Sequence, residues 1–180
     1  MHKFKFIPKF NARIIAICGL MVALEIIFER MLAVDTAITR VSFTFAARAV
    51  SGTCLGPVYA GIIGIISDIL GCLYKGYTIN LGITFSSMFK NVCFGLLLYN
   101  KQSNLRILIA AILDQFVGSF VITTGALFLF GGVPFSVQSL VTRLAQCVTM
   151  FVIEVIFLIL TRKKFLIYLK NVVKEISEEK

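Results

Sequence analysis

The chain contains no tryptophan and a single histidine, and charged residues make up only 15% of its 180 residues. One histidine, His2, cannot build a histidine-based catalytic group or a histidine metal site. The five cysteines stand singly in apolar segments, without the C-x-x-C spacing of metal and redox sites. The sequence also lacks a G-x-x-x-x-G-K-[ST] loop, which excludes ATP binding of that type. We therefore expect a protein that is not an enzyme.

Hydrophobic residues make up 58% of the chain and occur in long blocks, whereas soluble domains contain roughly 45 to 50%. This pattern predicts an all-α integral membrane protein, with residues 1–180 forming a single membrane domain. The expected six transmembrane helices cover approximately residues 12–32, 41–55, 57–73, 82–99, 105–130 and 135–160. Residues 161–180 are expected to form a cytoplasmic amphipathic tail.

The net charge of +9 is concentrated in three places. Basic residues precede the first span, lie between the fourth and fifth, and follow the sixth, so that six spans would bring all three places to one side. The positive-inside rule makes this side cytoplasmic, together with both termini. The placement therefore indicates membrane topology and contact with anionic lipid, and no nucleic-acid partner.

Residues 40–73 read as two short spans joined by a glycine-proline turn, and we expect them to form one wall of a polar pocket. Small residues recur on one face of the second span, which allows a neighbouring helix to approach closely. Asp68 lies on that face, and Arg48 lies in the first span. Because a charge inside an apolar helix is costly, each is expected to face the interior and to have a partner or a ligand.

Four spans each carry one charged residue at a similar depth in the membrane, when depth is calculated from the rise per residue of an α-helix. These residues are Arg48, Asp68, Lys90 and Arg143. Bases exceed acids in this outer half, which favours an anionic ligand that enters from outside. The alternative is internal pairing, in which Asp68 contacts Lys90 or Arg48 while Arg30 and Arg40 extend to the interface. Aromatic residues at the same level suit a flat heterocycle.

Two further acids, Asp114 and Glu154, fall in the inner half with no obvious basic partner at their own depth. Hydrogen bonding between helices or a protonated state would explain them, and we do not expect them in the site.

The first span carries a stripe of small residues, Ala12, Ala16, Gly19 and Ala23, along one helical face. Such a stripe either packs inside the protein or forms a docking surface for another membrane protein.

Six short spans, this stripe and an outer-half pocket together resemble the substrate-binding S-component of energy-coupling factor (ECF) vitamin transporters. Within that family, the run beginning at Arg40, the Gly56-Pro57 turn and the segment around Asp68 look like the folate-specific member. Two later stretches also look like the folate-specific member: Gly132-Val-Pro-Phe and, after it, Thr142-Arg143-Leu. The resemblance implies high-affinity vitamin capture, without a cofactor, in a bacterial cell membrane. It also implies a transmembrane coupling protein and two ATPase subunits as partners.

The combined prediction is a folate-like anion held by ten residues: Arg30, Arg40, Phe43, Arg48, Asp68, Lys75, Tyr77, Lys90, Arg143 and Gln146. The coupling protein would dock on Ala12, Ala16, Gly19 and Ala23. Lys90 occupies a position where the family usually has an apolar residue, so another vitamin, such as riboflavin or pantothenate, remains an alternative ligand. A structural or assembly protein with internally paired charges is the alternative outside transport.

Overall fold

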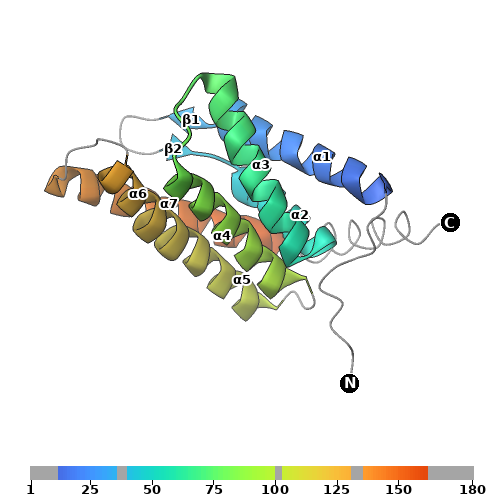
Figure 1. Cartoon of the computed structure of the whole chain (residues 1–180). Helices are drawn as coiled ribbons and strands as arrows, with labels where there is room; N and C mark the ends of the chain where they lie inside the picture. Colours follow the sequence, from blue (N-terminus) through green and yellow to red (C-terminus); the bar gives the residue numbers. More distant parts are fainter. Residues whose placement is uncertain (1–11, 36–39, 100–102, 131–135, 162–180) are drawn as a thin grey trace.

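The computed structural model describes residues 12–35, 40–99, 103–130 and 136–161. Their architecture is a bundle of helices, two of which contain π-helical segments labelled η (Figure 1). The elements in chain order are α1 (Ala12–Ile26), η1 (Ile27–Met31), β1 (Val34–Asp35), β2 (Arg40–Val41), α2 (Thr44–Leu55), α3 (Pro57–Lys75), α4 (Leu81–Leu98), α5 (Asn104–Ile112), η2 (Leu113–Thr123), α6 (Thr124–Phe130) and α7 (Val137–Thr161). The prediction of an all-helical protein is confirmed for these residues, apart from the two short strands.

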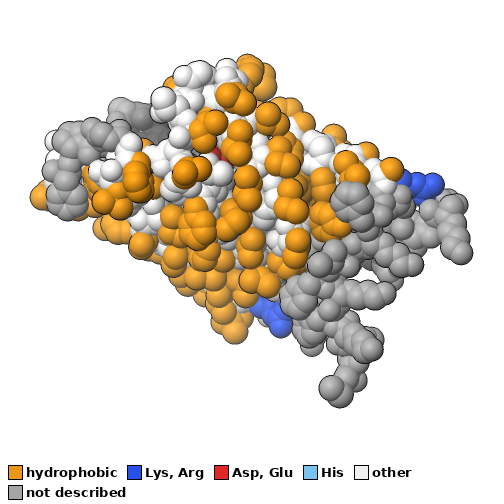
Figure 2. All heavy atoms as spheres, in the orientation of Figure 1, with side chains coloured by type: hydrophobic (Ala, Val, Ile, Leu, Met, Phe, Trp, Pro, Cys, Tyr) orange, Lys and Arg blue, Asp and Glu red, His pale blue; other side chains and the backbone are white. Residues whose placement is uncertain are grey.

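Four helical stretches in the described residues are long and apolar enough to cross a membrane, judged by length and composition: α3, α4, the continuous α5–η2–α6 segment, and α7. Hydrophobic side chains cover most of the face shown in Figure 2, and Lys and Arg side chains are visible only toward one end. By contrast, α2 has 12 residues, about 18 Å of helix, which is less than the roughly 30 Å of a hydrocarbon core. The arrangement of six spans stays a prediction.

The connection between η1 and α2 contains a small antiparallel pair of strands, which the sequence did not reveal. Val34 pairs with Val41, and Asp35 pairs with Arg40. We expected a connection between the spans over residues 12–32 and 41–55, whereas α2 begins only at Thr44. Strands of two residues are too short to show a period-2 pattern in the sequence.

The turn between α2 and α3 depends on a glycine followed by a proline. Gly56 has φ 84°, a backbone conformation that L side chains rarely adopt. Pro57 then begins α3, where its fixed φ suits the first turn and its missing N–H costs no hydrogen bond. These two residues allow the chain to reverse direction without an intervening loop.

The central helix of the bundle is α4, which contacts α2, α3, α5, η2 and α6. Glycines permit this close packing where α2 and α4 meet. A Cβ atom at Gly52 would lie 2.7 Å from the backbone nitrogen of Gly95 and 2.8 Å from the carbonyl carbon of Phe94. A Cβ atom at Gly95 would in turn overlap the backbone of Pro57. The helices α2, α3 and α4 therefore meet backbone to backbone at this point.

We predict that Gly52→Ala and Gly95→Ala each destabilise the protein by about 1–3 kcal/mol, the usual cost of overpacking. Gly125→Ala is the matched control, because nothing lies within 4 Å of a Cβ atom built at Gly125. Thermal or denaturant unfolding of the purified protein in detergent would measure the three variants. Equal stability of all three would contradict the close approach of the backbones.

Candidate functional site

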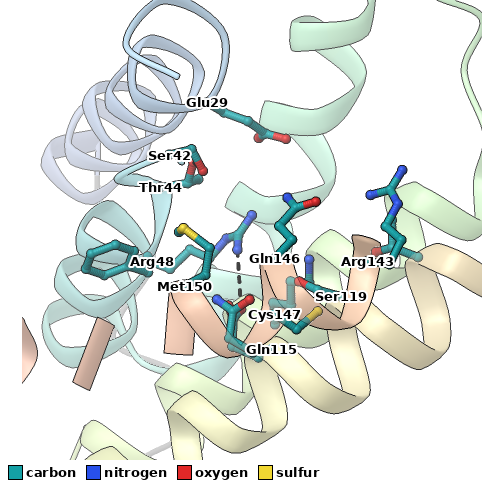
Figure 3. Close-up of a pocket in the computed structure, with 14 residues that line it drawn as sticks. Glu29, Ser42, Thr44, Arg48, Gln115, Ser119, Arg143, Gln146, Cys147 and Met150 are labelled. Carbon is teal, nitrogen blue, oxygen red and sulfur yellow. Dashed lines mark hydrogen bonds and ion pairs between the residues drawn. The ribbon is translucent and has the colours of Figure 1, made fainter. Parts of the chain in front are cut away.

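A cavity of about 150 Å³ lies between α2, α4, η2 and α7, below η1 and the start of α2 (Figure 3). Its lining contains more polar than apolar groups and comes from 14 residues: Glu29, Ser42, Thr44, Phe45, Arg48, Lys90, Asp114, Gln115, Ser119, Thr123, Arg143, Gln146, Cys147 and Met150. Three of these side chains are basic and two are acidic. The cavity is therefore suited to a polar ligand with negative charge.

Four of the ten residues predicted to bind ligand line this cavity: Arg48, Lys90, Arg143 and Gln146. They come from α2, α4 and α7, which are far apart in the sequence. Three of the four charges that we expected at one depth thus lie around one space, whereas Asp68 does not line it.

The side chain of Arg48 has an acidic partner that the sequence analysis placed outside the site. Its Nη1 atom lies 3.3 Å from Oδ1 of Asp114, and both side chains are buried. The expectation that Asp114 lies apart from the site is therefore wrong. Figure 3 shows the guanidinium of Arg48 directed toward the region of Gln115, which follows Asp114 in η2.

Gln115 extends this polar contact to α7. Its Nε2 atom donates a hydrogen bond to Oδ2 of Asp114 at 2.9 Å and another to Oε2 of Glu154 at 2.8 Å. Glu154 is completely buried. The interhelix hydrogen bonding expected for Asp114 and Glu154 is thus present, through one shared amide.

The side chain of Lys90 enters the cavity by passing over a glycine. A Cβ atom at Gly118 would lie 2.6 Å from Cγ and 2.7 Å from Cε of Lys90. Ser86 holds this part of η2, since its hydroxyl donates to the carbonyl oxygen of Gly118 at 2.7 Å. Among the described residues, neither Lys90 nor Arg143 makes a hydrogen bond or an ion pair. These two cations are available to a ligand.

Asp68 belongs to a second polar cluster, formed by η1, α3 and α4. Its Oδ1 atom lies 3.5 Å from Nη2 of Arg30, and its Oδ2 atom accepts a hydrogen bond from Thr84 at 2.7 Å. The pairing with Lys90 or Arg48 that we weighed for Asp68 is therefore wrong. Arg30 also lies over Gly71, since a Cβ atom built at Gly71 would be 2.9 Å from Nε of Arg30. The Nη2 atom of Arg30 lies 3.9 Å from Oε1 of Glu29. The cluster holds η1, and with it Glu29, at the edge of the cavity.

The other predicted ligand-binding residues lie outside the cavity. Phe43 is 40% exposed, and its ring contacts the ring of Phe45 at a centroid distance of 6.0 Å. Lys75 and Tyr77 are exposed at the end of α3 and in the loop after it. Arg40 begins β2, and its side chain lies outside the described part of the structure. In the described lining, Phe45 is the single aromatic ring, so the expected aromatic wall is not formed by those residues.

Sequence reasoning missed the contribution of η2, which supplies Asp114, Gln115, Ser119 and Thr123. The only signal was the pair of adjacent polar residues Asp114-Gln115 inside an apolar segment. A π-helical segment has i→i+5 hydrogen bonds, and such segments are frequent at functional sites. The lining carries hydrogen-bond donors and charges suited to binding, and no group of three potential metal ligands occurs among the described residues.

The predicted docking stripe lies on the surface of α1. Ala12, Ala16, Gly19 and Ala23 are all exposed, and nothing lies within 4 Å of a Cβ atom built at Gly19. Gly19 and Ala23 also line an almost wholly apolar groove of about 410 Å³ between α1 and α3. The four residues therefore do not pack inside the described bundle.

Comparisons with known proteins agree with this architecture. The family model of the ECF-type riboflavin transporter S component matches residues 9–164. The folate transporter FolT of Clostridium novyi (strain NT) is 36% identical over 139 residues, which cover 76% of this chain and 80% of that protein. The crystal structure of FolT bound with folic acid matches with a TM-score of 0.73 and 29% identity, over 82% of this chain and 91% of that one.

The family model extends over the helices that form the cavity and the exposed stripe, and the three matches bear out the resemblance seen in the sequence. The vitamins in the printed names differ, riboflavin for the family model and folate for the two relatives. What the names of the family model and the curated relative share is a vitamin transporter. Because the family model covers most of the chain and the curated relative is more than 30% identical, this chain belongs to the S-component family of ECF-type transporters.

Proposed function

We propose that this chain captures folate from the outside of a bacterial cell for ATP-driven uptake by partner subunits. The observation that carries the proposal is the pair of cations in the cavity, Lys90 and Arg143, which make no ion pair with the described residues. The identity of the vitamin is inferred from the two FolT relatives, since one is a folate transporter by name and the other is a structure with bound folic acid.

The charge of the cavity favours folate over the riboflavin in the name of the family model. A buried cation without a counterion is costly, and Lys90 is only 9% exposed. Folate brings two carboxylates that can approach Lys90 and Arg143, whereas riboflavin has no ionised group at neutral pH. Pantothenate, which has one carboxylate, could neutralise only one of these cations. A structural protein would need no such unpaired charge.

The size of the cavity indicates how much of the ligand it holds. Ligand pockets usually have volumes of about 300–1,000 Å³, and the cavity enclosed by the described residues has about 150 Å³. One end of folate would therefore occupy the cavity, and the rest would extend toward η1 and the start of α2. The predicted contacts Arg30, Arg40, Phe43, Lys75 and Tyr77 would lie along or beyond this path. Asp68 is buried and would act only through its ion pair with Arg30.

The orientation follows from the basic residues at the helix ends. Figure 1 shows the start of α1, the end of α2, the end of α4 and the start of α5 toward one end of the bundle. Arg13 lies at the start of α1 and Arg106 at the start of α5. If this end is cytoplasmic, as the positive-inside rule suggests, six spans place both termini inside and the cavity in the outer half.

Uptake against a gradient requires an energised partner, since the chain has no P-loop. The stripe of Ala12, Ala16, Gly19 and Ala23 is exposed, and small residues allow the closest approach of another helix. We therefore assign the stripe to a transmembrane coupling protein, which would connect this chain to two ATPase subunits.

The first test of the proposal concerns the two cations. We predict that Lys90→Met and Arg143→Ala each weaken folate binding by about 1.5–3 kcal/mol, the usual contribution of a hydrogen bond to a charged group, or roughly 10- to 150-fold in Kd. Isothermal titration of the purified protein would measure this. Arg106→Ala, at the opposite end of the bundle, is the control and should bind like wild type. Unchanged affinity in both cavity variants would sink the assignment.

The second test separates ligand binding from docking. We predict that Ala16→Leu and Gly19→Leu abolish transport and co-purification with the coupling subunits while folate affinity stays at the wild-type level, because these residues are remote from the cavity lining. Ala145→Leu, a matched substitution at an exposed position of α7, should leave both properties unchanged. Loss of binding with intact co-purification would instead place the stripe in the internal packing of the protein.

A further inference from the structure

Behind the cavity, one amide group joins two buried carboxyl groups. Gln115 donates to Asp114 and to Glu154 through the same Nε2 atom, at 2.9 Å and 2.8 Å. Asp114 lines the cavity, whereas Glu154 lies one side chain behind it, on α7. Any change of charge at Glu154 is therefore close to Asp114 and to the cavity.

The two carboxyl groups differ in their partners. Asp114 forms an ion pair with the guanidinium of Arg48 at 3.3 Å. Glu154 has no ion pair with a described residue, is completely buried, and has an Oε1 atom without a hydrogen-bond partner. An ionised carboxylate in this environment would be very costly, and such groups become neutral instead. The contacts of Glu154 therefore suit a carboxylic acid that carries its proton.

The charges of the surrounding interior give this proton a consequence. The polar interior of the described helices contains four bases, Arg30, Arg48, Lys90 and Arg143, and five acids, Glu25, Glu29, Asp68, Asp114 and Glu154. With every group ionised, acids outnumber bases and the interior repels an anion. A proton on Glu154 removes one negative charge next to the cavity, so that acids no longer outnumber bases and the repulsion of an anion falls.

We propose that Glu154 is a proton-binding site linked to the cavity, which takes an anion with high affinity only while Glu154 carries a proton. This inference rests on the proposed capture of an anionic vitamin. It gives Gln115 the role of a positioning residue that transmits the charge state of Glu154 to Asp114. Loss of the proton at high pH adds a negative charge behind Asp114, so affinity for an anion falls as the pH rises.

The charged and titratable groups near Glu154 and Asp114 define the controls. Arg48 on α2, Lys90 on α4 and Asp114 on η2 act on Glu154. Cys93 on α4 and Cys147 on α7 interact with Asp114, and Arg143 on α7 acts on Cys147. Since Lys90 and the cysteines also titrate at high pH, the dependence of wild type alone does not identify the group. The variant Glu154→Gln identifies the group, because its side chain keeps an oxygen for the hydrogen bond from Gln115 and cannot lose a proton.

The experiment measures the Kd of folate by isothermal titration from about pH 5 to about pH 9 for wild type, Glu154→Gln and Glu25→Gln. The expected result is that wild-type Kd rises by up to about tenfold per pH unit at the upper end, as for one linked proton. Glu154→Gln should match the wild-type Kd at low pH and lose the slope of the linked proton, so that only the shallower contribution of the other titrating groups remains. Glu25→Gln, the same change at the other acid without an ion pair, should keep the wild-type profile.

In the binding measurements, either of two results would overturn the inference: a flat wild-type profile, or parallel profiles for wild type and Glu154→Gln. Unfolding midpoints of the variants show whether each is folded. Infrared spectroscopy of the ligand-free protein gives an independent readout, since the carbonyl band of a protonated carboxyl should disappear in Glu154→Gln. If folate fails to bind at every pH while this band is present, the proposed ligand is wrong and the proton site stands. If folate binds and the band is missing, the proton site is wrong.

Discussion

The contact between Arg48 and Asp114 is the interaction on which the cavity depends. It joins α2 to η2 through buried groups 3.3 Å apart, and in an apolar bundle neither charge could be left alone without a large cost. Because Asp114 neutralises Arg48, the cations that remain for a ligand are Lys90 and Arg143. The amide of Gln115 donates to the carboxyl group of Asp114 and also to Glu154, which attaches α7. One ion pair thus positions three helical segments around the site and determines which charges are available for binding.

Close backbone approach is the second constraint, and it brings the charged side chains within reach of one another. The meeting of Gly52, Gly95 and Pro57 draws α2, α3 and α4 together, while Gly118 leaves a channel for the stem of Lys90. A methyl group at either place would occupy space that backbone or side-chain atoms now fill. The small residues of α2, α4 and η2 therefore serve the site, whereas those of α1 have no such internal function, since Ala12, Ala16, Gly19 and Ala23 are exposed.

Hydrophobic runs made the helices predictable, and the small number of charges inside them pointed to Arg48, Lys90 and Arg143. Partners were harder to predict, because they depend on how each helix is rotated. The rise of an ideal α-helix placed Asp114 below the other charges, but π-helical hydrogen bonding in η2 changes the direction in which its side chains project. Asp68 was assigned the wrong partners for a similar reason: η1 brings Arg30 over Gly71, within 3.5 Å of the carboxylate. Neither π-helical segment has a recognisable sequence period.

The two polar clusters are connected to α1, which relates the binding site to the exposed stripe. Glu25 on α1 accepts hydrogen bonds from Ser67 at 2.7 Å and from Asn91 at 3.5 Å. Asn91 in turn accepts from Ser51, whose hydroxyl also bonds to the backbone of Arg48. A continuous path of polar contacts thus runs from the helix that carries the stripe to the residue that pairs with Asp114. Because these contacts are buried, a shift of α2 on ligand binding would cost the hydrogen bond from Ser51 to Asn91 unless α4 followed. A shift of α4 would in turn cost the hydrogen bond from Asn91 to Glu25 unless α1 followed. This chain of buried hydrogen bonds relates the ligand cavity to the surface assigned to the coupling protein.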